Sequence, residues 1–199
     1  MRIARRFIVH GILLLMAATL VGEGLWFVYE PAPPSDHFVE FYFNESREAQ
    51  LAGDLPTAIA GYEGVLKLEP SFAAAHHELC LIALGRGEFE RAVARCAEAV
   101  RHEPDDANLL NSHGSALMQA GRVEEAIGHL ERAVSLDPSF VSAWYNLTGA
   151  YHLRGSPELA ENALRQLERL DPNASIQLRR QLRPEVERTL RDRGETSDH

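Results

Sequence analysis

Small, apolar and turn-forming positions recur along this chain every 34 residues. The alanines of this pattern are Ala58, Ala92, Ala126 and Ala160, the glycines are Gly53, Gly87, Gly121 and Gly155, and the prolines are Pro70, Pro104, Pro138 and Pro172. A fixed period of this length is typical of an array of helix pairs, because one pair cannot bury its apolar face alone. We therefore predict an all-α chain of stacked helix pairs.

Each unit is expected to hold two antiparallel helices joined by a tight turn at its glycine, which takes a positive φ at lower cost than other residues. Each proline ends a unit, since it cannot continue a helix interior. The residues after these prolines are predicted N-caps of the next helix, namely Ser71, Asp105, Ser139 and Asn173. The predicted helices are 37–51, 55–68, 72–84, 88–102, 106–119, 123–135, 140–153 and 157–170.

The repeat pattern resembles the tetratricopeptide repeat (TPR) family over residues 39–174. The fourth unit carries the family's signature positions most fully, as Trp144, Leu147, Tyr151, Gly155, Ala160, Leu164 and Pro172. The resemblance implies a right-handed TPR solenoid of four helix-turn-helix repeats, at 39–72, 73–106, 107–140 and 141–174. It also implies a protein-binding scaffold, which is the common use of such arrays.

An apolar stretch precedes the array at residues 7–28. As a helix it reaches about 33 Å, which matches the hydrocarbon core of a bilayer. It is predicted to be one N-terminal transmembrane helix. The alternative is a cleaved signal peptide, with Gly22 and Gly24 at the small-residue positions of the cleavage site. The long apolar continuation past Glu23 favours the uncleaved anchor.

The flanks of this stretch predict how the chain is oriented. Arg2, Arg5 and Arg6 precede it and are expected to stay in the cytoplasm by the positive-inside rule. Residues 1–29 are thus read as a cytoplasmic stub and anchor, and residues 30–36 as a proline-rich, stiff linker. The chain is then a single-pass protein of the inner (cytoplasmic) membrane, with the array at residues 37–174 in the periplasm.

Composition narrows the class of partner. The chain of 199 residues carries a formal net charge of −9, which disfavours nucleic acid because phosphates are repelled. Arginine outnumbers lysine 19 to 1, a weak indication of a bacterial genome rich in GC. The expected partners are proteins of the membrane or periplasm.

The resemblance also implies where a partner binds. In TPR arrays the first helices of successive units line a concave groove that takes a peptide or a helix. Matched position by position, the groove residues of this chain are Phe43, Arg47, Gln50, His77, Leu81, Leu84, Asn108, Asn111, Ser115, Met118, Tyr145 and His152. This set contains one basic residue, so the acidic carboxylate-clamp ligands of some family members do not fit. We expect a neutral groove that holds an extended backbone or apolar anchors.

The sequence offers no constellation that predicts catalysis, a cofactor or a metal. It has no glycine-rich phosphate loop, no nucleophile elbow, and neither two cysteines nor two histidines at ligand spacing on one helix. We therefore predict no enzyme, no cofactor and no metal site.

The two cysteines allow two interpretations. Pairing of the second unit's helices about Gly87 brings Cys80 and Cys96 nearly opposite each other. Outside the cytoplasm such a pair can form a disulfide, provided that its Cα atoms lie within about 7 Å. The alternative is a pair of buried free thiols that act as small core residues.

Residues 175–199 are predicted to form a capping helix, interrupted at Pro184, and a frayed tail. The complete sequence therefore favours a membrane-tethered, non-catalytic scaffold or assembly factor. The alternative is a permanent accessory subunit of a membrane complex, packed through its anchor and the aromatic residues near the start of the first repeat.

Overall fold

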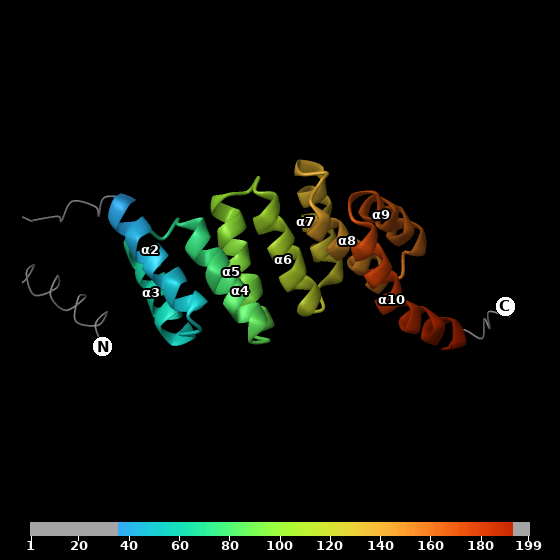
Figure 1. Ribbon diagram of the computed structural model, residues 1–199, viewed down its shortest axis with the longest axis horizontal. Coiled ribbons are helices and arrows are strands. Elements are labelled where there is room, and N and C mark those ends of the chain that lie inside the picture. Colours follow the sequence, from blue (N-terminus) through green and yellow to red (C-terminus); the bar gives the residue numbers. More distant parts are fainter. Residues whose placement is uncertain (1–35, 193–199) are drawn as a thin grey trace, which may run out of the picture. The chain divides into compact units, whose positions relative to one another are not determined.

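The computed structural model describes residues 36–192 and contains only helices over that range. Consecutive helices lie side by side along the chain (Figure 1). Their bounds are α2 (Asp36–Leu51), α3 (Leu55–Leu68), α4 (Ala73–Gly85), α5 (Phe89–His102), α6 (Ala107–Gln119), α7 (Val123–Leu136), α8 (Val141–Leu153), α9 (Pro157–Leu170) and α10 (Pro172–Asp192). The eight predicted helices are confirmed, with each boundary within one residue of its expected place.

The turn within each helix pair depends on its glycine. Gly53, Gly87, Gly121 and Gly155 all have φ between 72° and 80°, a region that residues with a Cβ atom rarely adopt. The predicted role of this glycine lattice is confirmed. The pairs α2–α3, α4–α5, α6–α7 and α8–α9 pack closely as a result.

The alanine lattice allows the two helices of a pair to approach. All four of its alanines are buried, and so are the small residues Ser46, Cys80, Gly114 and Thr148 on the facing helices. At Gly114 an added Cβ atom would lie 2.6 Å from Cγ of Leu130 and 3.3 Å from the backbone oxygen of Ala126. The α6–α7 pair therefore needs a glycine at this position.

Two details of the prediction are wrong. The first concerns the N-cap residues. Helices α4, α6 and α8 have as N-caps Phe72, Asp106 and Phe140, each one residue after the predicted cap. Of these, only Asp106 caps with its side chain, whose carboxylate accepts hydrogen bonds from the backbone N–H groups of Asn108 and Leu109. The connections after Pro70, Pro104 and Pro138 are thus one residue longer than predicted. In α10 the cap side chain is Asp171, which precedes the proline.

The second is the end of the chain. Helix α10 continues from Pro172 to Asp192 without a break at Pro184. A proline within a helix removes one hydrogen bond and commonly kinks the helix, but the remaining turns can still form. The cap of the array is therefore one long helix rather than two short ones.

The predicted anchor at residues 7–28 and most of the linker lie outside the described residues. Among residues 36–192, no helix is both long and apolar enough to cross a bilayer.

Candidate partner-binding face

The first helices of the repeats form one continuous face. Helix α4 contacts α6, α6 contacts α8, and α8 contacts the capping helix α10. The predicted groove residues lie on the first helices α2, α4, α6 and α8. We call this surface the first-helix face.

A ladder of side-chain hydrogen bonds runs across this face. His77 and Asn111, at one repeat position, each bond to a residue on the next first helix, and Tyr145, at the same position, bonds to the capping helix α10. The three rungs are His77 Nε2 with Ser112 Oγ at 2.8 Å, Asn146 Nδ2 donating to Asn111 Oδ1 at 2.9 Å, and Tyr145 Oη donating to Gln181 Oε1 at 2.6 Å. The ladder holds neighbouring repeats in a defined register.

A fourth contact ties the first repeat to the second in a different register. Nε2 of Gln50 donates to Oε2 of Glu78 at 2.9 Å, while Oε1 of the same amide is buried without a partner. Gln50, His77 and Asn111 therefore hold first helices together, and Tyr145 holds the fourth first helix to the capping helix α10. One hydrogen-bonding group of each side chain is already in use before any partner arrives.

Three of the apolar groove residues are half-buried and pack against the core. The ring of Phe43 contacts Tyr62 and Phe72, with centroids 5.4 and 5.2 Å apart. Leu84 and Met118 pack against the largest buried cluster of the core. Part of each of these side chains stays open to a partner.

The open part of the first-helix face is smaller than the predicted groove. Arg47, Leu81 and Asn108 are exposed, and Leu81 keeps 39% of its surface accessible. Ser115 and His152 are half-buried. A partner therefore meets one guanidinium, one apolar side chain and one amide on three successive first helices.

The charge beside this face is negative. Asn108 lines an open hollow of about 440 Å³ together with Asp105, Asp106 and Asp137. Burial lowers the pKa of His77, and the nearby carboxylates of Glu78 and Asp106 offset only part of that effect. The imidazole is therefore neutral at pH 7 and adds no positive charge to the face.

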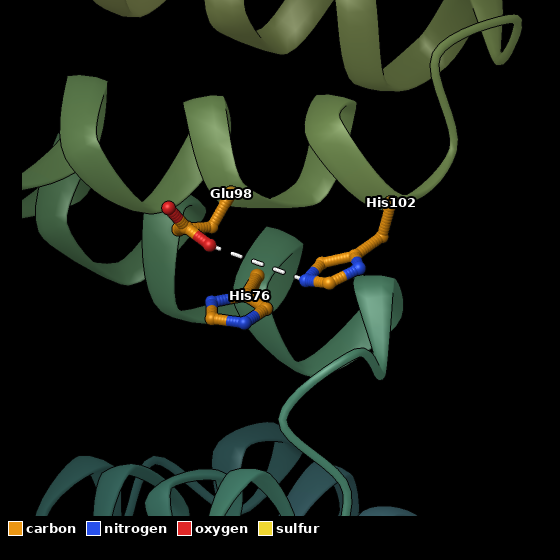
Figure 2. Close-up of side chains that lie close together, drawn as sticks. All are labelled: His76, Glu98 and His102. Atoms are coloured by element: carbon orange, nitrogen blue, oxygen red, sulfur yellow. Dashed lines mark ion pairs between the residues drawn. The ribbon is translucent and has the colours of Figure 1, made fainter.

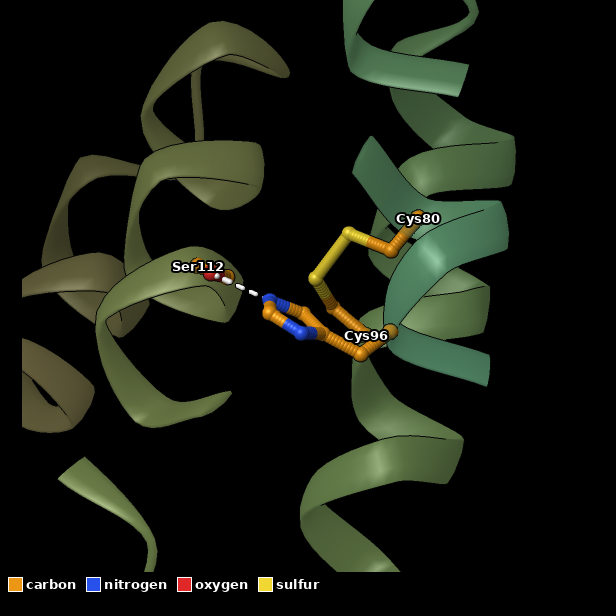
Figure 3. Close-up of a disulfide and its surroundings, with 4 residues drawn as sticks. Cys80, Cys96 and Ser112 are labelled. Atoms are coloured by element: carbon orange, nitrogen blue, oxygen red, sulfur yellow. Dashed lines mark hydrogen bonds between the residues drawn. A yellow bond between two sulfur atoms is a disulfide. The ribbon is translucent and has the colours of Figure 1, made fainter. Parts of the chain in front are cut away.

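A disulfide lies on the inner side of α4, behind the face. The sulfur atoms of Cys80 and Cys96 are bonded, and their Cα atoms are 5.3 Å apart (Figure 3). Both side chains are fully buried. The bond fixes α4 to α5 next to the rung between His77 and Ser112, so this part of the face has little freedom to move.

Sequence reasoning missed the residues that pair with the ladder positions 77, 111 and 145. Ser112 and Asn146 follow the predicted groove positions by one residue, as Glu78 does in the second repeat. All three are polar at the same position of the 34-residue period, and this regularity is the signal that could have found them. Gln181 gives no such signal, because it lies in the cap, outside the repeats.

One protein-family model and several known proteins are similar to this chain. The family model described as tetratricopeptide repeat matches residues 43–108, 78–139 and 111–175. The chain is 27% identical to the TPR repeat-containing protein YpiA of Bacillus subtilis over 124 residues, covering 62% of this chain and 29% of that protein. It is 34% identical to the peroxisomal targeting signal receptor of Candida glabrata over 104 residues, covering 51% of this chain and 18% of the receptor.

Among solved structures, the fold is similar to the crystal structure of MamA protein. The TM-score is 0.64 at 22% identity, and the match covers 77% of this chain and 90% of MamA. The chain spans less than a third of the length of the two curated relatives named above. The matched repeats, the turn glycines and the paired helices agree, and the chain belongs to the tetratricopeptide repeat family.

Proposed function

We propose that this protein is a non-catalytic scaffold or assembly factor, tethered to a membrane, whose first-helix face binds a peptide or helix of a protein partner. Membership of a family that binds proteins supports this function. A relative named as a receptor for a targeting signal supports binding of a short segment.

The observation that carries the proposal is that some residues of the first-helix face join the repeats while others stay exposed. The ladder residues join the repeats, whereas Arg47, Leu81 and Asn108 stay exposed. A face whose helices are already held in register loses little conformational entropy when it binds a ligand. The partner segment that fits best carries an apolar anchor for Leu81 and a basic group for the acidic hollow beside Asn108.

We place the array on the periplasmic side of an inner membrane. The apolar stretch at residues 7–28 and the arginines before it support an anchor with its N-terminus in the cytoplasm. The disulfide supports the same side, because such bonds persist in oxidising compartments and are rare in the cytosol.

Affinity purification from native membranes tests the proposed face. The matched variants are Leu81→Glu on the first helix α4 and Leu136→Glu on the second helix α7, two leucines with 39% and 44% of their surface exposed. We expect the first variant to lose its co-purifying protein at least tenfold, and the second to keep it. Equal recovery with both variants would exclude the first-helix face as the binding site.

The orientation in the membrane has its own test. In spheroplasts, protease added outside is expected to degrade the array, while intact cells with a sealed outer membrane protect it. Protection of the array in both preparations would place it in the cytoplasm and contradict the proposed side.

A second function, a permanent subunit of a membrane complex, is favoured by one observation. Phe38 and Phe41 lie on α2 near the start of the array and keep 48% and 44% of their surface exposed. A subunit packed through these rings is expected to co-purify in a fixed ratio through detergent, whereas an assembly factor dissociates or remains substoichiometric. The measured ratio separates the two functions.

A further inference from the structure

Three side chains of the second repeat gather where the start of α4 meets the end of α5. His76 comes from α4, and Glu98 and His102 lie one turn apart on α5 (Figure 2). One ring nitrogen of each imidazole and one oxygen of Glu98 lie within 4.8 Å of one another. Nε2 of His102 is 4.0 Å from Oε2 of Glu98. Two imidazoles and one carboxylate form a donor set that binds zinc in proteins.

His76 stands at the repeat position that Trp144 occupies in the fourth unit. Trp144 donates its indole N–H to the backbone oxygen of Pro138 at 2.9 Å, and Nε2 of His76 lies 3.0 Å from the backbone oxygen of Pro70. A carbonyl only accepts, so Nε2 carries the proton and Nδ1 keeps the lone pair. Nδ1 of His76 is buried and has no hydrogen-bond partner.

The repeat architecture requires neither His102 nor Glu98, the other two proposed ligands. At the position of His102 the remaining units have Leu68, Leu136 and Leu170. At the position of Glu98 they have Gly64, Arg132 and Gln166. Among the four repeats, this donor set occurs in the second alone. Folding of the array therefore does not explain why these residue types stand together.

The Glu98–His102 pair already interacts with a cation. Nη2 of Arg101 donates to Oε2 of Glu98 at 2.5 Å and lies 2.9 Å from Nε2 of His102. Nε2 of His102 is the acceptor in this contact, so it holds its lone pair toward the cation. The guanidinium is well exposed and can leave the pair at little cost, since surface ion pairs contribute about 1 kcal/mol or less.

We propose that His76, Glu98 and His102 bind a divalent transition-metal ion of the zinc class, with Arg101 displaced and water as the fourth ligand. Tetrahedral zinc places its ligand atoms about 3.3 Å apart, so the side chains must close by roughly 1 to 1.5 Å. The Glu98 side chain is 44% exposed, whereas the His102 side chain is 16% exposed and its ring stacks on that of His76. Rotation of these two side chains supplies that movement.

The rest of the second repeat prepares the ligands. The disulfide joins α4 at Cys80, one turn after His76, to α5 at Cys96, two residues before Glu98. Two cross-linked helices thus hold the three side chains close together before a metal binds.

This cluster escapes a search for paired ligands along one helix, because its two histidines come from different helices. It is independent of the proposed partner face.

Bound metal would link the first turn of α4 to the last turn of α5 and so stabilise the second repeat against opening. The metal is therefore expected to raise the thermal midpoint of unfolding as well as to bind.

Titration of the untagged full chain with Zn²⁺ tests the site, in buffer without reductant so that the cysteines remain bonded. Calorimetry is expected to show one ion per chain, and Co²⁺ to give the visible absorption of a tetrahedral complex. Glu98→Gln and His102→Leu are expected to weaken binding at least tenfold and to abolish the zinc-dependent rise in the thermal midpoint. Leucine is the residue of the other repeats at position 102, so this variant folds.

Two further variants make the outcome decisive. Arg101→Ala removes the competing cation and is expected to tighten Zn²⁺ binding, whereas His129→Ala changes a histidine outside the cluster and is expected to leave it unchanged. The proposal is overturned if the wild-type chain binds no Zn²⁺ saturably. It is also overturned if Glu98→Gln and His102→Leu bind as the wild type does, or if His129→Ala alone loses the ion.

Discussion

His113 and His129 lie against each other between α6 and α7, with ring centroids 4.2 Å apart. His113 is buried, and its Nδ1 has no hydrogen-bond partner. Burial lowers its pKa to about 4, with further lowering by His129 and Arg122 and a partial offset by Glu125. Burial also lowers the pKa of His129. Folding therefore favours the neutral form of both rings.

The stability of the array is expected to fall as the pH falls from about 6.5 to about 4. In this window His113 binds a proton in the unfolded chain but stays neutral in the folded chain. The loss from this residue is up to about 3 kcal/mol. Urea denaturation at pH 7 and pH 5 measures it. His113→Leu copies Leu79 and Leu147 of the neighbouring repeats and is expected to flatten the pH dependence. An unchanged slope in that variant would contradict the assignment to His113.

The Cys80–Cys96 bond closes a short loop, because the two cysteines are 16 residues apart in sequence. Cross-linking a loop of this size restricts the unfolded chain and stabilises the fold by about 3 kcal/mol. We expect Cys96→Ala, or treatment with reductant, to lower the free energy of unfolding by about 2 to 3 kcal/mol. Urea denaturation with and without reductant measures this, and thiol titration of the unfolded chain checks the redox state. Full labelling of the untreated protein would show that no disulfide forms.

The residue pattern predicted where helices pack closely better than it predicted which side chains bond to each other. Small residues repeated at a fixed period predict close helix approach, because only small side chains fit where two helices meet. The hydrogen bonds of Asn111 and Tyr145 depend on the register between neighbouring repeats, which no single residue encodes. Phe43 is expected in the groove, and its half-buried ring also contacts Tyr62 and Phe72, which its place in the repeat does not predict.

At the level of helices, the glycine and proline lattices predicted both ends of every helix in the four repeats to within one residue. The backbone constraints that glycine and proline impose are local, so the sequence alone predicts where they act. The exception is α10, which continues past Pro184. Before that proline, Leu178 packs against the α9 leucines Leu164 and Leu167 and so joins the first part of α10 to the array.

Two helical glycines provide a matched test of how closely paired helices approach. A Cβ atom at Gly114 would clash with Leu130, whereas one at Gly149 meets nothing within 4 Å. We expect Gly114→Ala to destabilise the protein by about 1 to 3 kcal/mol through overpacking. Gly149→Ala is expected to stabilise it by about 0.5 to 1 kcal/mol, because alanine loses less backbone entropy in a helix. Thermal unfolding compares the two, and the same sign for both variants would refute the packing of α6 on α7.

At the scale of the molecule, the array combines a stiffened second repeat with an open, mostly neutral face. The disulfide lies in that repeat, and the ladder couples the repeat to its neighbour through His77 and Ser112. Such a surface is suited to holding a partner segment. We propose that this segment lies across the first helices while the chain is tethered to a membrane.

Site-specific photocrosslinking in intact membranes tests that claim most directly. A photoreactive amino acid replaces Leu81 on α4 in one variant and Leu136 on α7 in the other, two exposed leucines on opposite members of the helix pairs. The prediction is one partner protein captured from position 81, and little or none of it from position 136. Capture of the same protein with equal yield from both positions, or from position 136 alone, would contradict binding at the first-helix face.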